Sequence, residues 1–339
     1  MRTFRYLKTR KTGHTLWVEI YNPRVNFIVT DMLEELFLLI KDVEKDDSIR
    51  VFVMTGGLAD IYIMHFSIPE LQRISEDNEK VFLNRMVKNR VSRFFLVHML
   101  NFTGWLMDAS AWYESATLKM AKSFREKVPS LFLWLQMTRL YLAIERMNKI
   151  TIAAINGPCN GGGVEISLCF DFRFMVGDQG FAIGQPECLI GIIPGGGGTQ
   201  RLPRLIGRPK ALEWMMRGNL LSPEEAKQIG LITDYFNKET FRDTVQEFAD
   251  LMGKRPPVAI DAIKKSVHEG MNGTLGKGLV LEMVQSIRCF DTDDAKTVIK
   301  NYIKLIEEKV DVPEEERMSP AELFDIMEHA RLVERFYGK

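Results

Sequence analysis

Two glutamates that stand next to glycine-rich runs are the residues of this chain best suited to chemistry. Glu165 follows the triple glycine at 161–163, and Glu187 precedes the four glycines at 195–198. Glycine has no Cβ, so a ligand can approach its backbone N–H group closely. Such amides can stabilise an oxyanion while a nearby carboxyl group moves a proton. The pattern therefore predicts acid–base chemistry beside a negatively charged oxygen.

Structural roles for the same motifs have to be weighed against this interpretation. The triple glycine could form only a tight turn, and Glu187 could be a structural acid. Two such runs, each with its own glutamate, favour the catalytic interpretation. The run 195–198 is not a P-loop, because no Lys-Ser or Lys-Thr follows it. The glycines at 273–278 also lack P-loop spacing and predict a loop between two helices.

Composition and charge argue against several classes of function. The 45 basic residues balance 45 acidic ones, so no basic field favours nucleic acid. The most apolar run, 94–107, is shorter than the roughly 20 residues that span a bilayer. The four cysteines and five histidines show no metal-ligand spacing, so we expect no metal and reduced, mostly buried thiols. These features predict a cytoplasmic protein.

The elements that must position the glutamates follow an α/β pattern. Apolar residues recur at three- and four-residue spacing over 31–43, which predicts a helix. Short apolar runs predict strands at 15–20, 50–55, 151–155 and 172–176. Strands that alternate with helices indicate an α/β core.

The character of the chain changes after residue 204. Helical patterns dominate there, at 210–216, 222–228, 238–252, 258–268 and 295–308. Ser222 and Ser319 are each followed by proline and acidic residues, a pattern typical of helix starts. An amphipathic helix is expected over 323–333. We predict an α/β core over 1–204, with an insertion at about 75–135, and an all-helical region over 205–339.

Four separated blocks of sequence resemble one family. They are 22–36, 152–165, 184–202 and 211–231, and they carry Ile-Ala-Ala-Ile-Asn-Gly, the triple glycine with Glu165, and Pro-Gly-Gly-Gly-Gly-Thr-Gln-Arg-Leu. In order and spacing they are similar to the enoyl-CoA hydratase/isomerase (crotonase) superfamily. The resemblance implies a crotonase-like ββα spiral core with a C-terminal helical oligomerisation region. It also implies a homotrimer, or trimers paired into a hexamer.

The resemblance further implies an acyl-CoA thioester as substrate, with coenzyme A as part of that substrate and no separate cofactor. The amides of Gly162 and Phe66 would form the oxyanion hole. The loop around Phe66 departs from the family pattern, because His65 stands where the family has glycine and Ser67 where it has aspartate. Gly161 and His65 would then lie beside the substrate.

The resemblance assigns the remaining contacts and the reaction. Arg24 and Val25 match positions whose backbone lies along coenzyme A. Family hydratases use both matching glutamates, Glu165 and Glu187, as catalytic acid and base, whereas isomerases tend to keep only the second. Both are present here, which favours a lyase of fatty acid metabolism that adds water to an enoyl-CoA. Alternatives are a double-bond isomerase, a C–C hydrolase, a fatty acyl thioester dehydratase or hydrolase, and a non-catalytic acyl-CoA-binding scaffold.

The segment between 68 and 150 is longer than the family's usual connection and rich in aromatic residues. We expect it to be helical, and three roles are open. It could shape a pocket or lid for a bulky or long acyl group. It could instead form an oligomer interface or extra core, or lie on a membrane surface. The scattered basic residues of the segment argue against the last role.

Overall fold

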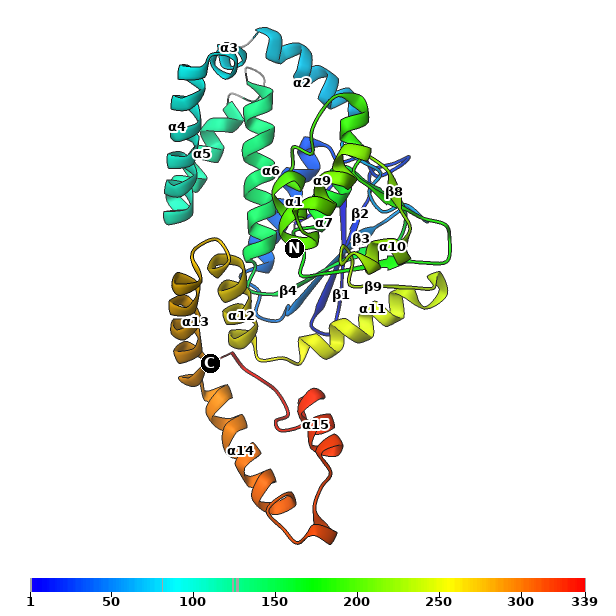
Figure 1. Ribbon diagram of the computed structural model, residues 1–339, viewed down its shortest axis with the longest axis vertical. Coiled ribbons are helices and arrows are strands. Elements are labelled where there is room, and N and C mark those ends of the chain that lie inside the picture. Colours follow the sequence, from blue (N-terminus) through cyan, green and yellow to red (C-terminus); the bar gives the residue numbers. More distant parts are fainter. Residues whose placement is uncertain (1, 81, 124, 126–127, 339) are drawn as a thin grey trace.

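The computed structural model describes residues 2–80, 82–123, 125 and 128–338. Its centre is a six-stranded sheet in the order β1-β2-β3-β4-β6-β9 (Figure 1). The strands are β1 (Leu7–Thr12), β2 (Thr15–Ile20), β3 (Val51–Gly56), β4 (Ile150–Ile155), β6 (Phe172–Val176) and β9 (Asp234–Phe236). β1 and β2 form an antiparallel hairpin, and the other neighbours pair in parallel.

Both faces of this sheet are covered, which explains why β3 and β4 are apolar throughout. Phe52 and Met54 of β3 pack in one core with α1 (Thr30–Val43) and α6 (Pro129–Arg146). Val51 and Val53 face the opposite way and pack against α11 (Lys238–Gly253). The alternation of side chains along a strand therefore divides the interior into two layers.

A small second sheet holds the predicted site next to the large one. It consists of β5 (Cys159–Asn160), β7 (Ile183–Gly184) and β8 (Leu220–Leu221), in that order. β5 follows β4 directly, and α7 (Gly162–Ser167) follows β5. The chain thus passes from the main sheet through a short strand into the helix that carries Glu165.

The insertion is helical, as expected, and projects beyond the sheet (Figure 1). It comprises α2 (Ile68–Lys80), α3 (Phe82–Lys88), α4 (Arg90–Ala109) and α5 (Ala111–Ser123), and it leads into α6. The Asn89 side chain accepts the amides of Val91 and Ser92 and so caps α4. Arg139 of α6 binds Asp108 and Glu114, which attaches the end of α4 and the start of α5 to the body.

Five aromatic side chains of α4 and α5 lie on the outer surface: Phe94, Phe95, Phe102, Trp105 and Trp112. Phe95, Trp105 and Trp112 are 64%, 62% and 77% exposed. They therefore do not line a closed pocket within this chain, which weakens the expectation that these residues enclose an acyl group. In the 68–150 connection, α6 contributes many buried residues to the core.

The sequence predicts an all-helical region after residue 204. The structure shows that this prediction is wrong in part. The helices of this region are α9 (Arg208–Arg217), α10 (Pro223–Gln228), α11, α12 (Pro257–Gly270), α13 (Leu275–Phe290), α14 (Asp293–Lys309) and α15 (Pro320–Glu328). However, β8 and β9 also belong to it, and β9 extends the main sheet beside β6. A three-residue strand is too short for its alternation to be recognised without its neighbour.

One local expectation is confirmed and two need refinement. Both capping boxes are present, Ser222 with Glu225 and Ser319 with Glu322. The loop predicted at 273–278 is shorter, because the Thr274 hydroxyl caps α13 and the helix begins at Leu275. α15 ends at Glu328, since Ala330 adopts a φ of 54° that a helix does not tolerate.

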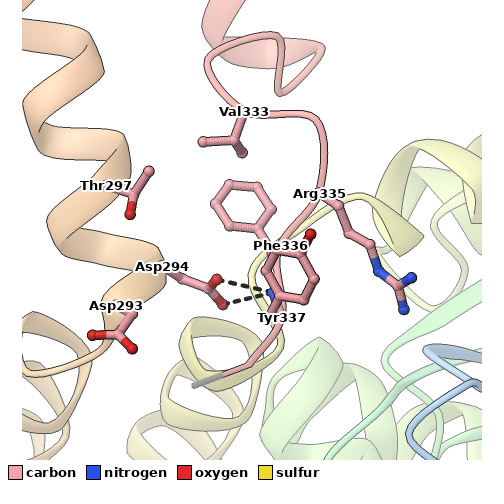
Figure 2. A pocket seen from close by; sticks show the side chains of 7 residues that line it. All are labelled: Asp293, Asp294, Thr297, Val333, Arg335, Phe336 and Tyr337. Atoms are coloured by element: carbon pink, nitrogen blue, oxygen red, sulfur yellow. Dashed lines mark hydrogen bonds between the residues drawn. The ribbon is translucent and has the colours of Figure 1, made fainter.

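The C-terminal tail returns to the body of the protein. The Asp294 carboxylate at the start of α14 accepts the amides of Tyr337 (2.9 Å) and Gly338 (2.6 Å), as Figure 2 shows for Tyr337. Phe336 of the tail is buried. In the described residues we find no helix with the length and apolarity to cross a membrane. Of the cysteines, Cys159 and Cys169 are buried, whereas Cys188 is exposed and Cys289 intermediate.

Candidate active site

The triple glycine is required by close packing at the start of α7. Gly161 has a φ of 53°, a conformation that residues with a Cβ rarely adopt. A Cβ on Gly163 would lie 2.6 Å from the backbone oxygen of Ile63, which is closer than atoms can approach. The helix therefore starts directly against the 61–66 segment. This contact brings Glu165 and the predicted oxyanion loop to the same place.

Glu165 is buried, with one carboxylate oxygen held by the second glycine run. Its Oε1 accepts the N–H groups of Gly196 (2.7 Å) and Gly198 (2.8 Å). A Cβ on Gly196 would lie 2.7 Å from Oε2, so the run must lack side chains to fit around the carboxyl group. Burial, together with the charge of Glu187, raises the pKa of Glu165 to about 7, although the two amides and Arg201 act in the opposite direction.

Glu187 approaches the same space from a separate loop. It begins the 3₁₀ turn η1 (Glu187–Ile190), and its Oε1 accepts the side-chain amide of Gln185 at 2.9 Å. Its Oε2 is buried and accepts no hydrogen bond from any residue that the structure describes. Burial raises its pKa, while Gln185 and His65 act in the opposite direction. A Cβ on Gly161 would lie 2.9 Å from Oε1, so this carboxyl group lies against the triple glycine.

Phe66 and Gly162 supply two amides at adjacent positions. The Cβ position of Gly162 is 3.6 Å from the nitrogen of Phe66. Ile28 donates to the carbonyl of His65 (3.0 Å) and accepts from the amide of Ser67 (2.8 Å). Because successive peptide groups of an extended segment point to opposite sides, the N–H of Phe66 points away from Ile28. Within the described ranges, neither of the two amides has a protein acceptor.

The departures in the oxyanion loop have local explanations. Nδ1 of His65 lies 2.7 Å from the carbonyl oxygen of Phe66, which fits the tautomer with the proton on Nδ1. The ring also packs on Phe27, with the centroids 4.5 Å apart. His65 therefore braces the peptide that follows it, and its side chain faces Glu187 closely enough to lower the pKa of that group.

Arg24 and Val25 lie beside this loop. Val25 accepts the amide of Met64 (3.4 Å) through its carbonyl group. Arg24 is exposed and has a φ of 89°, which is strained for a residue with a Cβ. The next residue, Asn26, is buried and donates through Nδ2 to the carbonyls of Ile61 (3.2 Å) and Tyr62 (3.0 Å). Asn26 thus ties the 24–26 turn to the oxyanion loop.

Three supporting residues were not predicted. Gln185 is fully buried and orients Glu187. Tyr141 of α6 lies 3.2 Å from the Cβ position of Gly196, and burial and the charge of Glu165 raise its pKa. Arg201 donates to the carbonyl of Gly196 (3.2 Å) and pairs with Glu145 of α6 at 2.6 Å. Gln185 and Arg201 lie in the 184–202 block, so that motif could have indicated them. No motif in the sequence around Tyr141 indicates a role at the site.

The raised pKa of Glu165 predicts a pH dependence of stability. A folded-state pKa of about 7 against an ordinary value of 4.5 means that the folded protein binds the proton more tightly. This contribution is complete below pH 4.5 and is lost as the pH rises through about 7. Relative to Glu165→Gln, the wild-type free energy of unfolding should fall by as much as about 3 kcal/mol over that range. Urea unfolding of both proteins at several pH values measures it, and parallel curves would contradict the assignment.

The fold is that of a crotonase-type α/β protein. The enoyl-CoA hydratase from Bacillus anthracis has a similar solved structure, with a TM-score of 0.67 and 23% sequence identity over 88% of this chain and 96% of that one. Likeness at this level of identity concerns the fold, and it confirms the crotonase-like core predicted from the sequence.

Sequence comparison gives the family. A model of the enoyl-CoA hydratase/isomerase family matches residues 117–311, more than half of the chain. The chain therefore belongs to the enoyl-CoA hydratase/isomerase family, as the four blocks predicted.

Two relatives illustrate the range of similarity. The short-chain-enoyl-CoA hydratase of Clostridium acetobutylicum is 25% identical over 295 residues, 87% of this chain and 93% of the relative. The crotonyl-CoA hydratase of Syntrophomonas wolfei is 35% identical over 166 residues, 49% of this chain and 63% of the relative.

Proposed function

We propose that this protein is an enoyl-CoA hydratase that adds water across the α,β-double bond of an acyl-CoA thioester. The observation that carries the proposal is the meeting of two carboxyl groups, the buried Glu165 and the half-buried Glu187, in front of two amides without acceptors among the described residues. The names of the relatives support the same reaction class. The CoA-binding role of Arg24 and Val25 is part of this proposal.

The proposed reaction uses each group for one task. The thioester oxygen accepts hydrogen bonds from Phe66 and Gly162, which stabilise the enolate-like charge that develops there. One glutamate removes a proton from water as the oxygen forms its bond to the β-carbon. The other donates a proton to the α-carbon, so the double bond is consumed and one water is added. The raised pKa values of both acids suit proton transfer near neutral pH.

Isomerisation is the second candidate, and a specific observation favours it. Only Glu187 has a buried carboxylate oxygen without a hydrogen bond from the described residues, whereas Glu165 is held by two amides. A single mobile proton carrier can shift a double bond without adding water. C–C bond hydrolysis and fatty acyl thioester dehydration or hydrolysis would use the same oxyanion hole, and a scaffold would bind acyl-CoA without turnover.

The experiment is a spectrophotometric assay with α,β-enoyl-CoA thioesters of increasing acyl length. We expect loss of the enoyl thioester absorbance band and formation of a 3-hydroxyacyl-CoA, identified by mass spectrometry. Conversion of a β,γ-enoyl-CoA without water addition would favour the isomerase. No turnover of any enoyl-CoA, with ligand binding unchanged in Glu165→Gln, would favour the scaffold. A preference for short straight chains would contradict the bulky-acyl hypothesis.

Assembly and location complete the proposal. A homotrimer or hexamer is supported by exposed apolar side chains on α13, where Leu279, Met283 and Phe290 are each more than half exposed. The aromatic surface of α4 offers a further contact area. Light scattering on the sample used for the assay reports the mass of the assembly. We retain a cytoplasmic location, for which the balanced charge and the free cysteines are the support.

A further inference from the structure

A cavity of about 250 Å³ lies at the N-terminal ends of β3 and β4, at the opposite end of the sheet from the candidate active site. Arg50 and Lys149 reach it from the positions just before β3 and β4, and Arg255 from the turn before α12. Arg335 of the C-terminal tail forms another wall. In the candidate site, Phe66 follows the other end of β3 and Glu165 the other end of β4. The cavity is therefore separate from the proposed chemistry.

Cations outnumber acids around this cavity. The charged residues that line it are Arg50, Lys149, Arg255, Arg288, Arg335, Asp47 and Asp261. Asp261 already pairs with Arg288 at 2.6 Å and with Lys265 at 2.9 Å. Asp47 is fully exposed and lies 3.9 Å from Lys149. In the part of the chain that the structure describes, Arg255 and Arg335 have no carboxylate within ion-pair distance, so the cavity keeps a net positive charge.

Two of these cations are poorly compensated in their own surroundings. Lys149 is only 7% exposed, and its nearest carboxylate, at 3.9 Å, is beyond hydrogen-bond length. Arg50 donates to the carbonyls of Gly253 and Phe336, but its Nε is buried and meets no acceptor among the described residues. Burial lowers the pKa of both groups, and the charge of Arg335 lowers that of Arg50 further, whereas Asp294 acts in the opposite direction at Arg50, and Asp47 and Asp46 at Lys149. A buried charge without a counter-charge is destabilising.

The backbone adds to the positive charge around the cavity. Pro257 and Val258, which begin the 14-residue helix α12, also line the cavity. The first N–H groups of a helix have no partner within it, and its N-terminal end carries partial positive charge. Helix starts of this kind favour phosphate groups, and arginine side chains bind phosphate through two parallel hydrogen bonds.

We propose that this cavity binds a phosphate-bearing anion, which joins the C-terminal tail to the body of the protein. Arg335 and Gly338 come from the tail, whereas Arg50, Lys149 and Arg255 come from the body. Figure 2 shows the Arg335 side chain directed away from α14, on the side opposite to Asp294. An anion at this place would neutralise both groups of cations at once. Its source is either a free phosphate or diphosphate, or the phosphates of a nucleotide.

Calorimetric titration tests this with pyrophosphate and with adenosine 3′,5′-bisphosphate, each at constant ionic strength set with chloride. The wild-type chain should bind at least one of them with a stoichiometry of one per chain. The double variant Arg255→Gln/Arg335→Gln should bind at least about tenfold more weakly. Tighter binding of the bisphosphate would identify a nucleotide as the source, and tighter binding of pyrophosphate a free phosphate.

Matched variants separate this site from general charge effects and from the active site. Lys254→Gln removes an exposed cation next to Arg255 that does not line the cavity, and it should bind like the wild type. Glu165→Gln should also bind the anion normally, because the cavity lies at the opposite ends of the strands from Glu165. Bound anion should slow hydrogen exchange over 335–338. The proposal would be overturned if the wild type binds neither probe, or if the double variant, shown by circular dichroism to be folded, binds with wild-type affinity.

Discussion

Replacing either glutamate of the site by glutamine should reduce kcat/KM for enoyl-CoA hydration by about 10²- to 10⁴-fold. Glutamine keeps the shape of the side chain but cannot exchange a proton with water or with the α-carbon. General acid–base catalysis typically contributes a factor of this size. In Glu165→Gln the amides of Gly196 and Gly198 can still donate to the side-chain oxygen, so the fold should be retained. Steady-state kinetics on both variants measure the loss.

The two variants also separate the two candidate reactions. If the protein is a hydratase, both substitutions should slow water addition by this factor. If it is an isomerase that relies on Glu187 alone, Glu165→Gln should keep most of its activity on a β,γ-enoyl-CoA. Glu213→Gln is the matched control, because Glu213 is an exposed acid of α9 that pairs with Lys210 and Arg217 on the surface of the same helix. Hydration at wild-type rate in Glu165→Gln would contradict its catalytic role.

Removing the Gly162 amide by Gly162→Pro should lower kcat by about 10²- to 10³-fold, the loss typical for one oxyanion-hole donor. Proline has no backbone N–H, and Gly162 is the first residue of α7, a position where proline is well tolerated. Gly162 is not among the residues with positive φ, so the substitution does not require a forbidden backbone conformation. The effect should therefore appear in turnover rather than in stability.

Gly162→Ala is the matched control for this prediction. It keeps the N–H, and its Cβ would lie 3.4 Å from Cδ1 of Ile28 and 3.5 Å from Cβ of Phe66, contacts that require at most a small adjustment. We expect the alanine variant to be more active than the proline variant and both to unfold near the wild-type temperature. Equal activity of the two variants would show that the Gly162 amide does not bind the reacting oxygen.

The sequence by itself determined the elements that depend on short-range patterns. The apolar runs of β2, β3, β4 and β6 and the periodicity of α1 are visible without neighbours, because a strand or helix repeats every few residues. The capping boxes at Ser222 and Ser319 are visible for the same reason. The glycine runs also identified the family, since their order along the chain is a property of the sequence alone.

Only the tertiary structure decided how the candidate site is assembled. The bonds between Glu165 and the amides of Gly196 and Gly198 join residues 31 and 33 positions apart. The outward N–H of Phe66 depends on pairing with Ile28, and β9 is a strand only because β6 lies beside it. The exposure of the α4 aromatics and the return of the tail to Asp294 were likewise invisible. Contacts of this kind depend on where distant segments pack, which no local pattern of residues specifies.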